Sequence, residues 1–361
     1  MDDRVNVSTP GRVCLFGEHQ DYLGLPVIPC AISLRIEITG GPTRKPLFHL
    51  SLPDIGSEIS IPLNKPITYS VERDYFRSVV NVLRRKGFTF SSGCEGVVRG
   101  KIPINAGTSS SSALIVTWVN FLSRISDQKK ILSADESARF AHEAEVLEFH
   151  EPGGMMDHFS TAYGGVMWLS FFPDLSLETL NPLLKTFVLG DSMEPKDTKG
   201  ILARVKNHVL LIVDRLRQRY PGFSLQTVQL NDLRAYAGEL NEEERTLLHG
   251  TVKNRDITGR AKLLLKERWF DENKFGALLN EHQMVLRDVL RISTPKIDRM
   301  IDAAIGAGAY GGKINGSGGG GCMFVYAPER PEAVAEAIVK EGGKAFIVSP
   351  DTGTRIELMK E

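Results

Sequence analysis

Hydrophobic positions in the first 180 residues follow two different periods. Short runs of β-branched and apolar residues lie between glycine and proline residues, which is typical of strands. The predicted strands are 5–8, 12–16, 27–38, 96–104 and 165–172. Apolar residues recur at helical spacing elsewhere, and the predicted helices are 74–86, 111–123 and 133–149. Ser133 and Glu136 have the spacing of a capping box, in which each side chain bonds a free backbone amide at the start of a helix.

The remainder of the chain is richer in helical periodicity. Five segments carry it: 200–219, 241–249, 258–267, 275–290 and 294–306. Strands return around a glycine cluster at 313–314, 322–326 and 344–348. A proline-containing stretch at 173–182 separates the two parts, so we predict an N-terminal domain over 1–180 and a C-terminal domain over 181–361. Because helices and strands occur in separate runs, we expect an α+β fold rather than a doubly wound sheet.

Composition limits the possible functions. Lys plus Arg equals Asp plus Glu at 44 each, so the chain lacks the basic field expected of a nucleic-acid-binding protein. The four cysteines form no C-x-x-C pair, which disfavours a zinc site, and each lies in an apolar or glycine-rich run where a small buried residue is expected. The N-terminus lacks the layout of a signal peptide, and no apolar run approaches the roughly 18 residues of a membrane span. We therefore expect a cytoplasmic protein with neither nucleic acid nor membrane as a partner.

A serine-rich segment is the sharpest local feature. Residues 105–113 are Asn-Ala-Gly-Thr-Ser-Ser-Ser-Ser-Ala, between a predicted strand and a predicted apolar helix. Backbone N–H groups of such a turn and the positive end of the following helix can bind an anion. The hydroxyls can cap the helix, bind phosphate oxygens or reach a magnesium ion. The G-K-[ST] ending of a Walker A loop is missing, and a flexible loop or a simple helix cap is an equally open interpretation.

A second glycine-rich segment spans 311–321, with the sequence Gly-Gly-Lys-Ile-Asn-Gly-Ser-Gly-Gly-Gly-Gly. Ordering so many glycines costs conformational entropy. Their presence within an apolar stretch indicates that another backbone or a ligand approaches closely. A mobile hairpin loop explains the pattern equally well.

Two carboxylates lie in apolar surroundings. Glu145 is on an apolar flank of the predicted helix 133–149, and Asp157 follows a glycine pair within Gly-Gly-Met-Met-Asp-His-Phe. A carboxylate in such a place is costly unless it is paired or bound to a cation. One metal ligand and one acid/base group would suit phosphoryl transfer. A helix-face salt bridge for Glu145 and a helix N-cap for Asp157 are the structural alternatives.

Polar residues also cluster directly after the predicted strand 12–16. Glu18, His19 and Asp21 lie close enough in sequence to surround a polyhydroxylated ligand, although His19 could equally be a structural loop residue. The other histidines show no H-E-x-x-H pairing, which argues against zinc catalysis.

Together these segments resemble the galactokinase branch of the GHMP kinases. Residues 10–24, Pro-Gly-Arg-Val-Cys-Leu-Phe-Gly-Glu-His-Gln-Asp-Tyr-Leu-Gly, are similar to the galactokinase signature. The loop 104–114 resembles the ATP phosphate loop of that family, and 312–322 resembles its third, glycine-rich motif. Residues 144–157 and the terminal Ser-Pro-Asp-Thr-Gly-Thr-Arg at 349–355 are similar to further galactokinase segments. The motifs occur in the family's order over nearly the whole chain.

The resemblance implies a two-lobed α+β kinase with ATP and a sugar in the cleft between the lobes. Asp157 would accept the proton of the sugar hydroxyl, and Arg12 would stabilise charge on the transferred phosphoryl group. Ser111 and Glu145 would hold Mg²⁺. The residues implied to wrap the ATP phosphates are Asn105, Ala106, Gly107, Thr108, Ser109, Ser110 and Ser111. Those implied to bind the sugar are Glu18, His19, Gln20, Asp21 and Gly154. The expected reaction is phosphorylation of the anomeric hydroxyl of galactose or a related monosaccharide.

Several departures leave the acceptor open. Cys14, Gln20 and His158 stand where galactokinases usually have Asn, Thr and Gln, and 190–199 is unlike the usual segment that supplies a sugar-contacting tyrosine. Arabinose, a hexuronic acid or a heptose are alternative acceptors. Mevalonate-type relatives normally carry Lys at the position of Arg12 and lack the Asp-Tyr pair at 21–22. A non-catalytic sugar and ATP sensor is the alternative of another class, but all four expected catalytic and metal residues are present.

Overall fold

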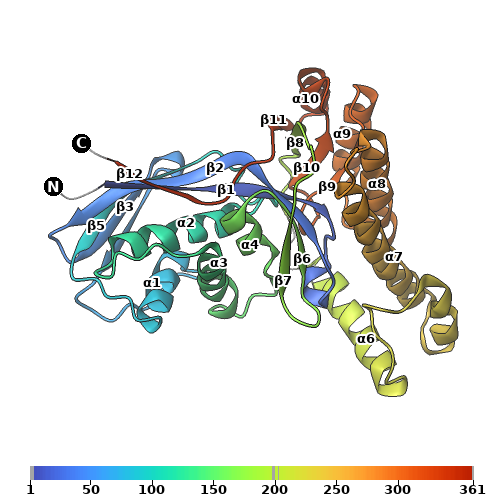
Figure 1. Ribbon diagram of the computed structural model, residues 1–361, viewed down its shortest axis with the longest axis horizontal. Coiled ribbons are helices and arrows are strands. Elements are labelled where there is room, and N and C mark those ends of the chain that lie inside the picture. The colour runs from blue at the N-terminus through green and yellow to red at the C-terminus, as the bar shows by residue number, and fades with distance from the viewer. Residues whose placement is uncertain (1–3, 197–199, 202, 360–361) are drawn as a thin grey trace.

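The computed structural model describes residues 4–196, 200–201 and 203–359. An eight-stranded sheet dominates the N-terminal part (Figure 1). Its main path has the order β12-β1-β2-β5-β3-β4, while β6 pairs with β2 and β7. The strands are β1 (Arg4–Phe16), β2 (Ile28–Thr43), β3 (Leu47–Leu52), β4 (Ser57–Pro62), β5 (Gly93–Gly100), β6 (Val166–Ser170), β7 (Ser176–Leu180) and β12 (Arg355–Met359). All pairs are antiparallel except β3 with β5.

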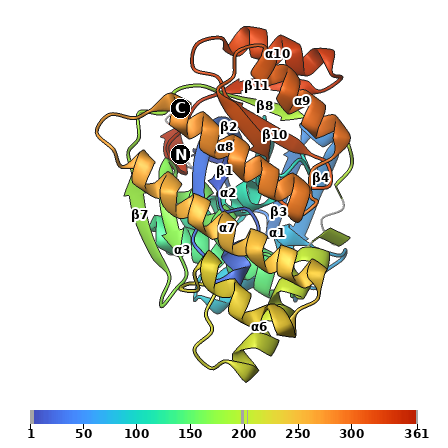
Figure 2. The same ribbon diagram turned by 90° about the vertical axis from the view of Figure 1, so that its right-hand side faces the viewer.

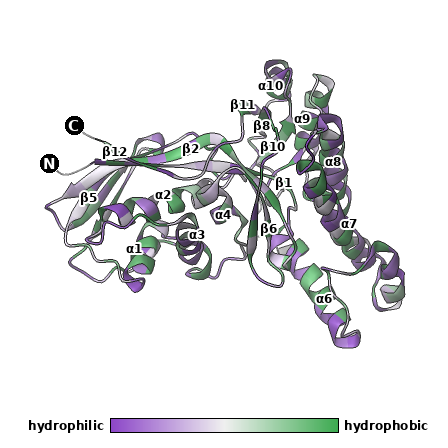
Figure 3. Cartoon of the chain, viewed as in Figure 1, coloured by the Kyte–Doolittle hydropathy of each residue, from purple (hydrophilic) through white to green (hydrophobic). Residues whose placement is uncertain are grey.

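Four helices lie beneath this sheet (Figure 1). They are α1 (Tyr75–Arg85), α2 (Ser110–Ile125), α3 (Ala134–His142) and α4 (Met156–Tyr163). Their apolar faces and the inward side chains of the strands form one core, in which Trp118 and Phe48 are fully buried. Figure 3 shows the apolar residues, in green, along β2, α1 and α2. The capping box predicted at Ser133 and Glu136 is confirmed, and α3 continues into a π-helical turn, η3 (Glu143–Leu147).

A smaller antiparallel sheet organises the C-terminal part, with the order β11-β8-β10-β9. Its strands are β8 (Phe187–Asp191), β9 (Gly311–Ile314), β10 (Cys322–Tyr326) and β11 (Lys344–Val348). The helices are α6 (His208–Arg219), α7 (Glu242–Leu265), α8 (Glu272–Met284), α9 (Pro295–Gly306) and α10 (Pro331–Lys340). Figure 2 shows α7 and α8 running side by side. Short helical turns are η1 (Asp21–Leu23), η2 (Pro53–Ile55), η4 (Ala203–Asn207), η5 (Leu230–Glu239) and η6 (Val285–Val289).

The predicted α+β class is confirmed, and some elements differ from the prediction. The strands predicted at 5–8 and 12–16 are one strand, β1, because a bulge between Pro10 and Gly11 lets the ladder continue past the proline. The helices predicted at 241–249 and 258–267 are one helix, α7. A side chain at Gly250 would overlap Val289, so this glycine permits close helix packing instead of ending the helix. The elements α4, α10, β3, β4, β7, β8 and β12 were not predicted.

The N-terminal and C-terminal parts of the chain contribute side chains to a common hydrophobic core. The second half of β1 contributes Val13, Leu15 and Phe16 to a core that also contains Phe187 of β8 and Phe324 of β10. The last strand, β12, pairs with β1, so the C-terminus returns to the first sheet. The division at residue 180 stays a prediction. Within the ranges that the structure describes, no helix is both long enough and apolar enough to cross a membrane.

A buried ion pair joins the two sheets where β1 ends. Glu18 follows β1 and pairs with Lys313 of β9, and their side chains are 1% and 0% exposed. The Lys313 ammonium also donates to the carbonyls of Cys14 (2.8 Å) and Ile314 (3.0 Å). Burial raises the pKa of Glu18, and Lys313 acts in the opposite direction. The Lys313 ammonium is therefore the main group that opposes the effect of burial on the Glu18 carboxylate, with Arg12 as a smaller contribution.

We predict that Lys313→Met destabilises the fold strongly, because it leaves the Glu18 charge buried without a partner. The expected loss in the free energy of unfolding is about 3–5 kcal/mol, as found when one member of a buried pair is removed. The loss should shrink at acidic pH, where Glu18 takes up a proton, and in the double variant with Glu18→Gln.

Urea denaturation checks this prediction. The matched control is Lys45→Met, since Lys45 pairs with Glu95 at 3.7 Å on the surface and such pairs contribute only about 0–1 kcal/mol. Equal losses for the two lysine variants would contradict the assigned importance of the buried pair.

Candidate active site

A cleft of about 950 Å³ lies between the two parts of the chain. It is lined by residues from both, in the segments 12–22, 104–112, 145–158, 191–196 and 316–321. The predicted site residues on its walls are Arg12, Glu18, His19, Asp21, Asn105, Ala106, Gly107, Ser109, Ser110, Ser111, Glu145, Gly154 and Asp157. Two predicted residues, Gln20 and Thr108, do not line it. The fold thus brings the predicted site residues to one cleft, although Arg12 and Asp157 are 145 positions apart in the sequence.

The serine-rich loop has the backbone form of an anion-binding turn. Asn105, Gly107 and Ser109 adopt left-handed backbone with φ of 57°, 88° and 60°. Alternation of left-handed and right-handed residues can turn successive N–H groups toward one anion. Ser110 then begins α2, whose positive end adds to the attraction. The loop therefore has the backbone form of a site that can hold an anion.

The second glycine-rich segment packs directly on this loop. The Cys322 N–H donates to the Ala106 carbonyl at 2.8 Å. A Cβ on Gly321 would lie 2.8 Å from that same carbonyl oxygen, and one on Gly316 would lie 3.0 Å from the Gly107 oxygen. The glycines are thus explained by close approach of another backbone, which is one of the two interpretations that the sequence left open.

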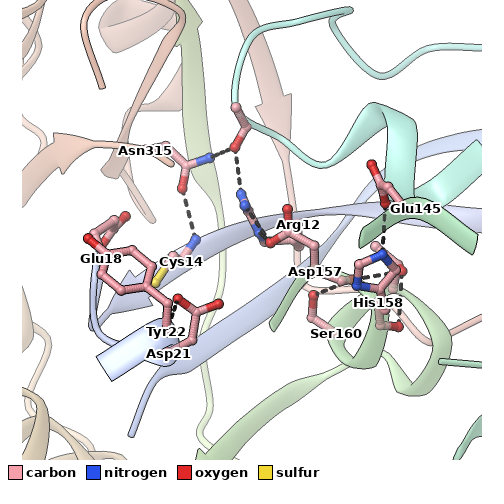
Figure 4. Close-up of polar contacts among 12 residues, drawn as sticks. Arg12, Cys14, Glu18, Asp21, Tyr22, Glu145, Asp157, His158, Ser160 and Asn315 are labelled. Carbon is pink, nitrogen blue, oxygen red and sulfur yellow. Dashed lines mark hydrogen bonds and ion pairs between the residues drawn. The ribbon is translucent and has the colours of Figure 1, made fainter. Parts of the chain in front are cut away.

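Arg12 is the centre of the polar network (Figure 4). Its Nε and Nη2 reach Oδ1 of Asp157 at 2.8 and 2.6 Å, and its Nη1 donates to the Gly107 carbonyl at 2.5 Å. Asn315 donates to the same carbonyl through Nδ2 (2.8 Å) and accepts from the Cys14 N–H through Oδ1 (2.8 Å). Strand β1, the serine-rich loop and α4 are therefore held in fixed relative positions.

Asp157 presents a carboxylate on the wall of the cleft. It lies in the first turn of α4, whose N-cap is Met155, so the N-cap interpretation of Asp157 is wrong. Its side chain keeps 31% exposure while Arg12 keeps 4%. Burial by itself would raise the pKa of Asp157, but the Arg12 guanidinium outweighs it and the pKa lies below its ordinary value. Asp157 is therefore an ionised hydrogen-bond acceptor at the cleft wall.

Asp21 provides a second carboxylate at the same end of the cleft. The Tyr22 N–H donates to its Oδ1 at 2.9 Å. A Cβ at Gly154 would overlap the Asp21 carboxylate, so any larger residue there would displace Asp21. Burial, and then the charge of Asp157, raise the pKa of Asp21 to about 6. Near neutral pH the group is mainly ionised and gains from any donor that a ligand brings.

His19 joins the two walls of the cleft. Its Nε2 lies 3.0 Å from the Ser317 carbonyl and its Nδ1 lies 2.6 Å from the Tyr22 hydroxyl. Because a carbonyl only accepts, Nε2 carries the proton and the Tyr22 hydroxyl donates to Nδ1. Burial lowers the pKa of His19 to about 4, which agrees with a neutral ring. Both ring nitrogens are engaged by protein groups, so the geometry is that of a structural residue that fixes Tyr22.

Gln20 is placed differently from its neighbours. Its side chain is buried, and neither amide atom has a hydrogen-bond partner among the described residues. Together with its position off the cleft wall, this gives no direct route to a ligand. A contact of Gln20 with an acceptor stays a prediction.

Glu145 and Ser111 line the cleft at the phosphate-loop end. Glu145 lies in η3, and its Oε2 is 2.7 Å from Nε2 of His158. A carboxylate and a hydroxyl are ligands that suit Mg²⁺, which commonly adds phosphate oxygens and water. No cluster of three or more His, Cys, Asp or Glu residues in the described ranges could hold a metal by itself. The donor set therefore fits a cation that is shared with a phosphate-bearing ligand.

Lys196 is a cleft residue that the sequence patterns did not indicate. Its ammonium nitrogen lies 3.4 Å from the position of a Cβ on Gly107, beside the serine-rich loop. Burial lowers the pKa of Lys196 to about 8. A single lysine after a strand is normally a surface residue, so only the fold reveals it. Arg73 and Tyr75 also line the cleft without having been predicted.

Family signatures match three parts of the chain. The description "GHMP kinases N terminal domain" matches residues 74–165, and "GHMP kinases C terminal" matches 261–345. The "Galactokinase galactose-binding signature" matches residues 2–42. These ranges include the serine-rich loop, the glycine-rich segment and the Glu18 to Tyr22 motif.

Relatives of two activities are similar over most of the chain. A mevalonate kinase of Thermococcus onnurineus (strain NA1) is 29% identical over 98% of both chains. A galactokinase of Roseiflexus sp. (strain RS-1) is 30% identical over 88% of this chain and 82% of that protein.

Solved structures agree on the fold. Lactococcus lactis galactokinase complexed with galactose superposes with a TM-score of 0.84 at 19% identity, covering 98% of this chain and 95% of that one. Methanococcus jannaschii mevalonate kinase gives 0.74 at 21% identity, covering 96% and 98%. Signatures, relatives and fold together show that this chain belongs to the GHMP kinase family and is galactokinase-like.

Proposed function

We propose that this phosphotransferase moves the γ-phosphoryl group of ATP to the anomeric hydroxyl of galactose or a related monosaccharide. The observation that carries the proposal is the arrangement of two carboxylates. Asp21 lies against Gly154, next to Asp157, which is paired with Arg12. Polyhydroxylated acceptors supply several donors to such a site. The galactose-binding signature over residues 2–42 supports the same acceptor class.

The nucleotide end of the proposal rests on the serine-rich loop. Its N–H groups and the start of α2 bind the phosphates, and Lys196 adds a positive charge beside the loop. Ser111 and Glu145 would hold a magnesium ion, which would supply charge neutralisation to the phosphates. Phosphoryl transfer depends mainly on alignment and such neutralisation, and the described residues provide both.

At the acceptor end, Asp157 orients the sugar hydroxyl and accepts its proton. Because Arg12 lowers the pKa of Asp157, this carboxylate is a weak base. Weak basicity suits a loose transition state in which the proton leaves late. Arg12, fixed by Asp157 and Gly107, stabilises the charge that develops on the transferred group.

Phosphorylation of mevalonate is the second candidate, because mevalonate kinases are among the similar proteins. Mevalonate carries a carboxylate, which requires a cation at the acceptor end. Asp21 and Asp157 place two carboxylates there, and the Arg12 guanidinium is already paired with Asp157. Lys206 donates to the Pro152 carbonyl at 2.8 Å and is, besides Arg12, a basic group that interacts with Asp21. The balance of charge favours a neutral acceptor.

We predict that affinity for ATP falls as pH rises through about 8, because the Lys196 ammonium loses its proton in the free protein. Phosphates favour the charged form, so the dissociation constant should rise above that pH. Lys196→Met should weaken binding at pH 7 by about tenfold or more, which corresponds to the ~1.5–3 kcal/mol of a hydrogen bond to a charged group. Its pH profile should be flat over this range.

Calorimetric titration with a non-hydrolysable ATP analogue checks the prediction. Lys185→Met is the control, since Lys185 is 59% exposed and pairs with Glu272. If Lys196→Met keeps the pH dependence of the wild type, Lys196 does not contact the phosphates.

The acceptor is tested by ADP release across a panel of galactose, arabinose, a hexuronic acid, a heptose and mevalonate. We expect turnover with a neutral sugar. With that sugar, Asp157→Asn should lower kcat by about 10²–10⁴, the range for loss of a general base, and nearer its lower end because the base is weak. Asp191→Asn, which alters another cleft carboxylate, should have a much smaller effect.

Two outcomes would overturn the assigned function, and a third would overturn the role of Asp157. Turnover of mevalonate without turnover of any sugar would assign the acceptor to the other branch of the family. Sugar binding without ADP release would indicate a sensor. A normal kcat in a folded Asp157→Asn protein would remove Asp157 from the mechanism.

A further inference from the structure

His158 is a buried histidine whose ring makes one hydrogen bond with the described part of the chain. Its residue is 2% exposed, and its Nε2 lies 2.7 Å from Oε2 of Glu145. The contact joins α4 to η3, thirteen positions earlier in the chain. Figure 4 shows this pair beside the pair formed by Arg12 and Asp157. His158 follows Asp157 directly, yet none of the roles proposed above uses it.

The direction of this hydrogen bond follows from its partners. An ionised carboxylate only accepts, so Nε2 carries the proton and donates to Glu145. The other nitrogen, Nδ1, is buried without a partner among the described residues. The environment therefore selects one tautomer, with its N–H directed at Glu145.

Glu145 in turn depends on this one donor. Among the described residues, no other group forms a hydrogen bond or ion pair with its carboxylate. Its second oxygen, Oε1, accepts no hydrogen bond from the described part of the protein. A glutamate side chain has several rotamers, and freezing them costs conformational entropy. The bond from His158 selects the rotamer in which Oε2 is held and Oε1 is left available.

We propose that His158 is a positioning residue that presents Oε1 of Glu145 to the divalent cation shared by Ser111 and the phosphates of ATP. The proposal rests on the proposed kinase function but not on the identity of the acceptor. Hydrogen-bond partners of metal ligands commonly contribute a factor of about 10–100 in metal affinity.

A purely structural role makes a different prediction. The His142 ring packs edge-on against His158 with ring centroids 5.3 Å apart, so His158 could merely fill space in the core. In that case removal of either ring should have similar effects. If His158 positions Glu145, metal binding should weaken only when the N–H donor at position 158 is lost, and removal of the His142 ring should have little effect.

The experiment measures how strongly Mg²⁺ promotes binding of a non-hydrolysable ATP analogue. Calorimetry gives the dissociation constants without and with Mg²⁺, and their ratio is the magnesium coupling. We expect His158→Leu to reduce this coupling about 10–100-fold and to leave metal-free binding unchanged. His158→Gln, which keeps an N–H donor, should retain most of the coupling. His142→Leu is the packing control and should also retain it.

Glu145→Gln and the double variant with His158→Leu complete a cycle. If His158 acts through Glu145, the double variant should lose no more coupling than Glu145→Gln alone. Should His158→Leu not fold, His158→Met provides the same test with a more adaptable apolar side chain.

Three results would overturn the proposal. They are unchanged coupling in a folded His158→Leu protein, equal losses in the His158→Leu and His142→Leu proteins, and unchanged coupling in Glu145→Gln. Because no acceptor is present, the outcome is independent of the sugar panel. A failed sugar assignment would leave this result standing, and a failed coupling test would leave the sugar assignment standing.

Discussion

The Arg12 guanidinium is a buried charge, and the groups around it must compensate for its lost hydration. A cation with 4% exposure needs an anion and further acceptors within reach, because an unpaired buried charge costs several kcal/mol. Asp157 and the Gly107 carbonyl meet this need. Three segments that are distant in sequence must therefore meet at one point. The acceptor-binding wall and the phosphate loop cannot shift independently while this arrangement persists.

The glycines of the site have a complementary task. The serine-rich loop and the segment 315–322 contact each other through their backbones, and side chains at Gly316 or Gly321 would force them apart. Asn315 then bonds the Gly107 carbonyl that Arg12 also uses. The polar network of Arg12, Asn315 and Gly107 thus depends on neighbouring glycines, because side chains there would keep the two backbones apart. Close backbone approach explains why so entropically costly a segment is retained beside the cleft.

Local patterns in the sequence were sufficient to predict many helices and strands, but they did not predict which of these elements contact one another. The strands β10 and β11 and the capping box at Ser133 follow from short-range periodicity. The eight-residue α4 was missed, because it follows a glycine pair and is too short to show a helical period. The strand β12 has mostly exposed side chains and lacks an apolar signal. Its place is fixed by pairing with β1, which no local pattern encodes.

The candidate site shows the same limit. Arg12 and Asp157 could be paired only through motif order and resemblance, since 145 residues separate them. Lys196, and the bond between His158 and Glu145, carry no local signature, because their significance lies in what the fold places beside them. Conversely, Gln20 belongs to the signature run but lies off the cleft wall. Membership in a motif and contact with a ligand are therefore separate properties.

The acceptor end illustrates why similarity alone does not choose between related substrates. Galactokinases and mevalonate kinases match this chain with nearly equal identity. Burial, and then the charge of Asp157, raise the pKa of Asp21 to about 6, so the free site already disfavours negative charge. A hydroxyl group of the acceptor can donate a hydrogen bond to these carboxylates and stabilise them. A carboxylate on the acceptor would add a third negative charge and increase the repulsion unless a cation accompanied it. Asp21 and Asp157 repel each other in the free site. The same two carboxylates can therefore select the acceptor, since only a ligand with several hydrogen-bond donors stabilises both.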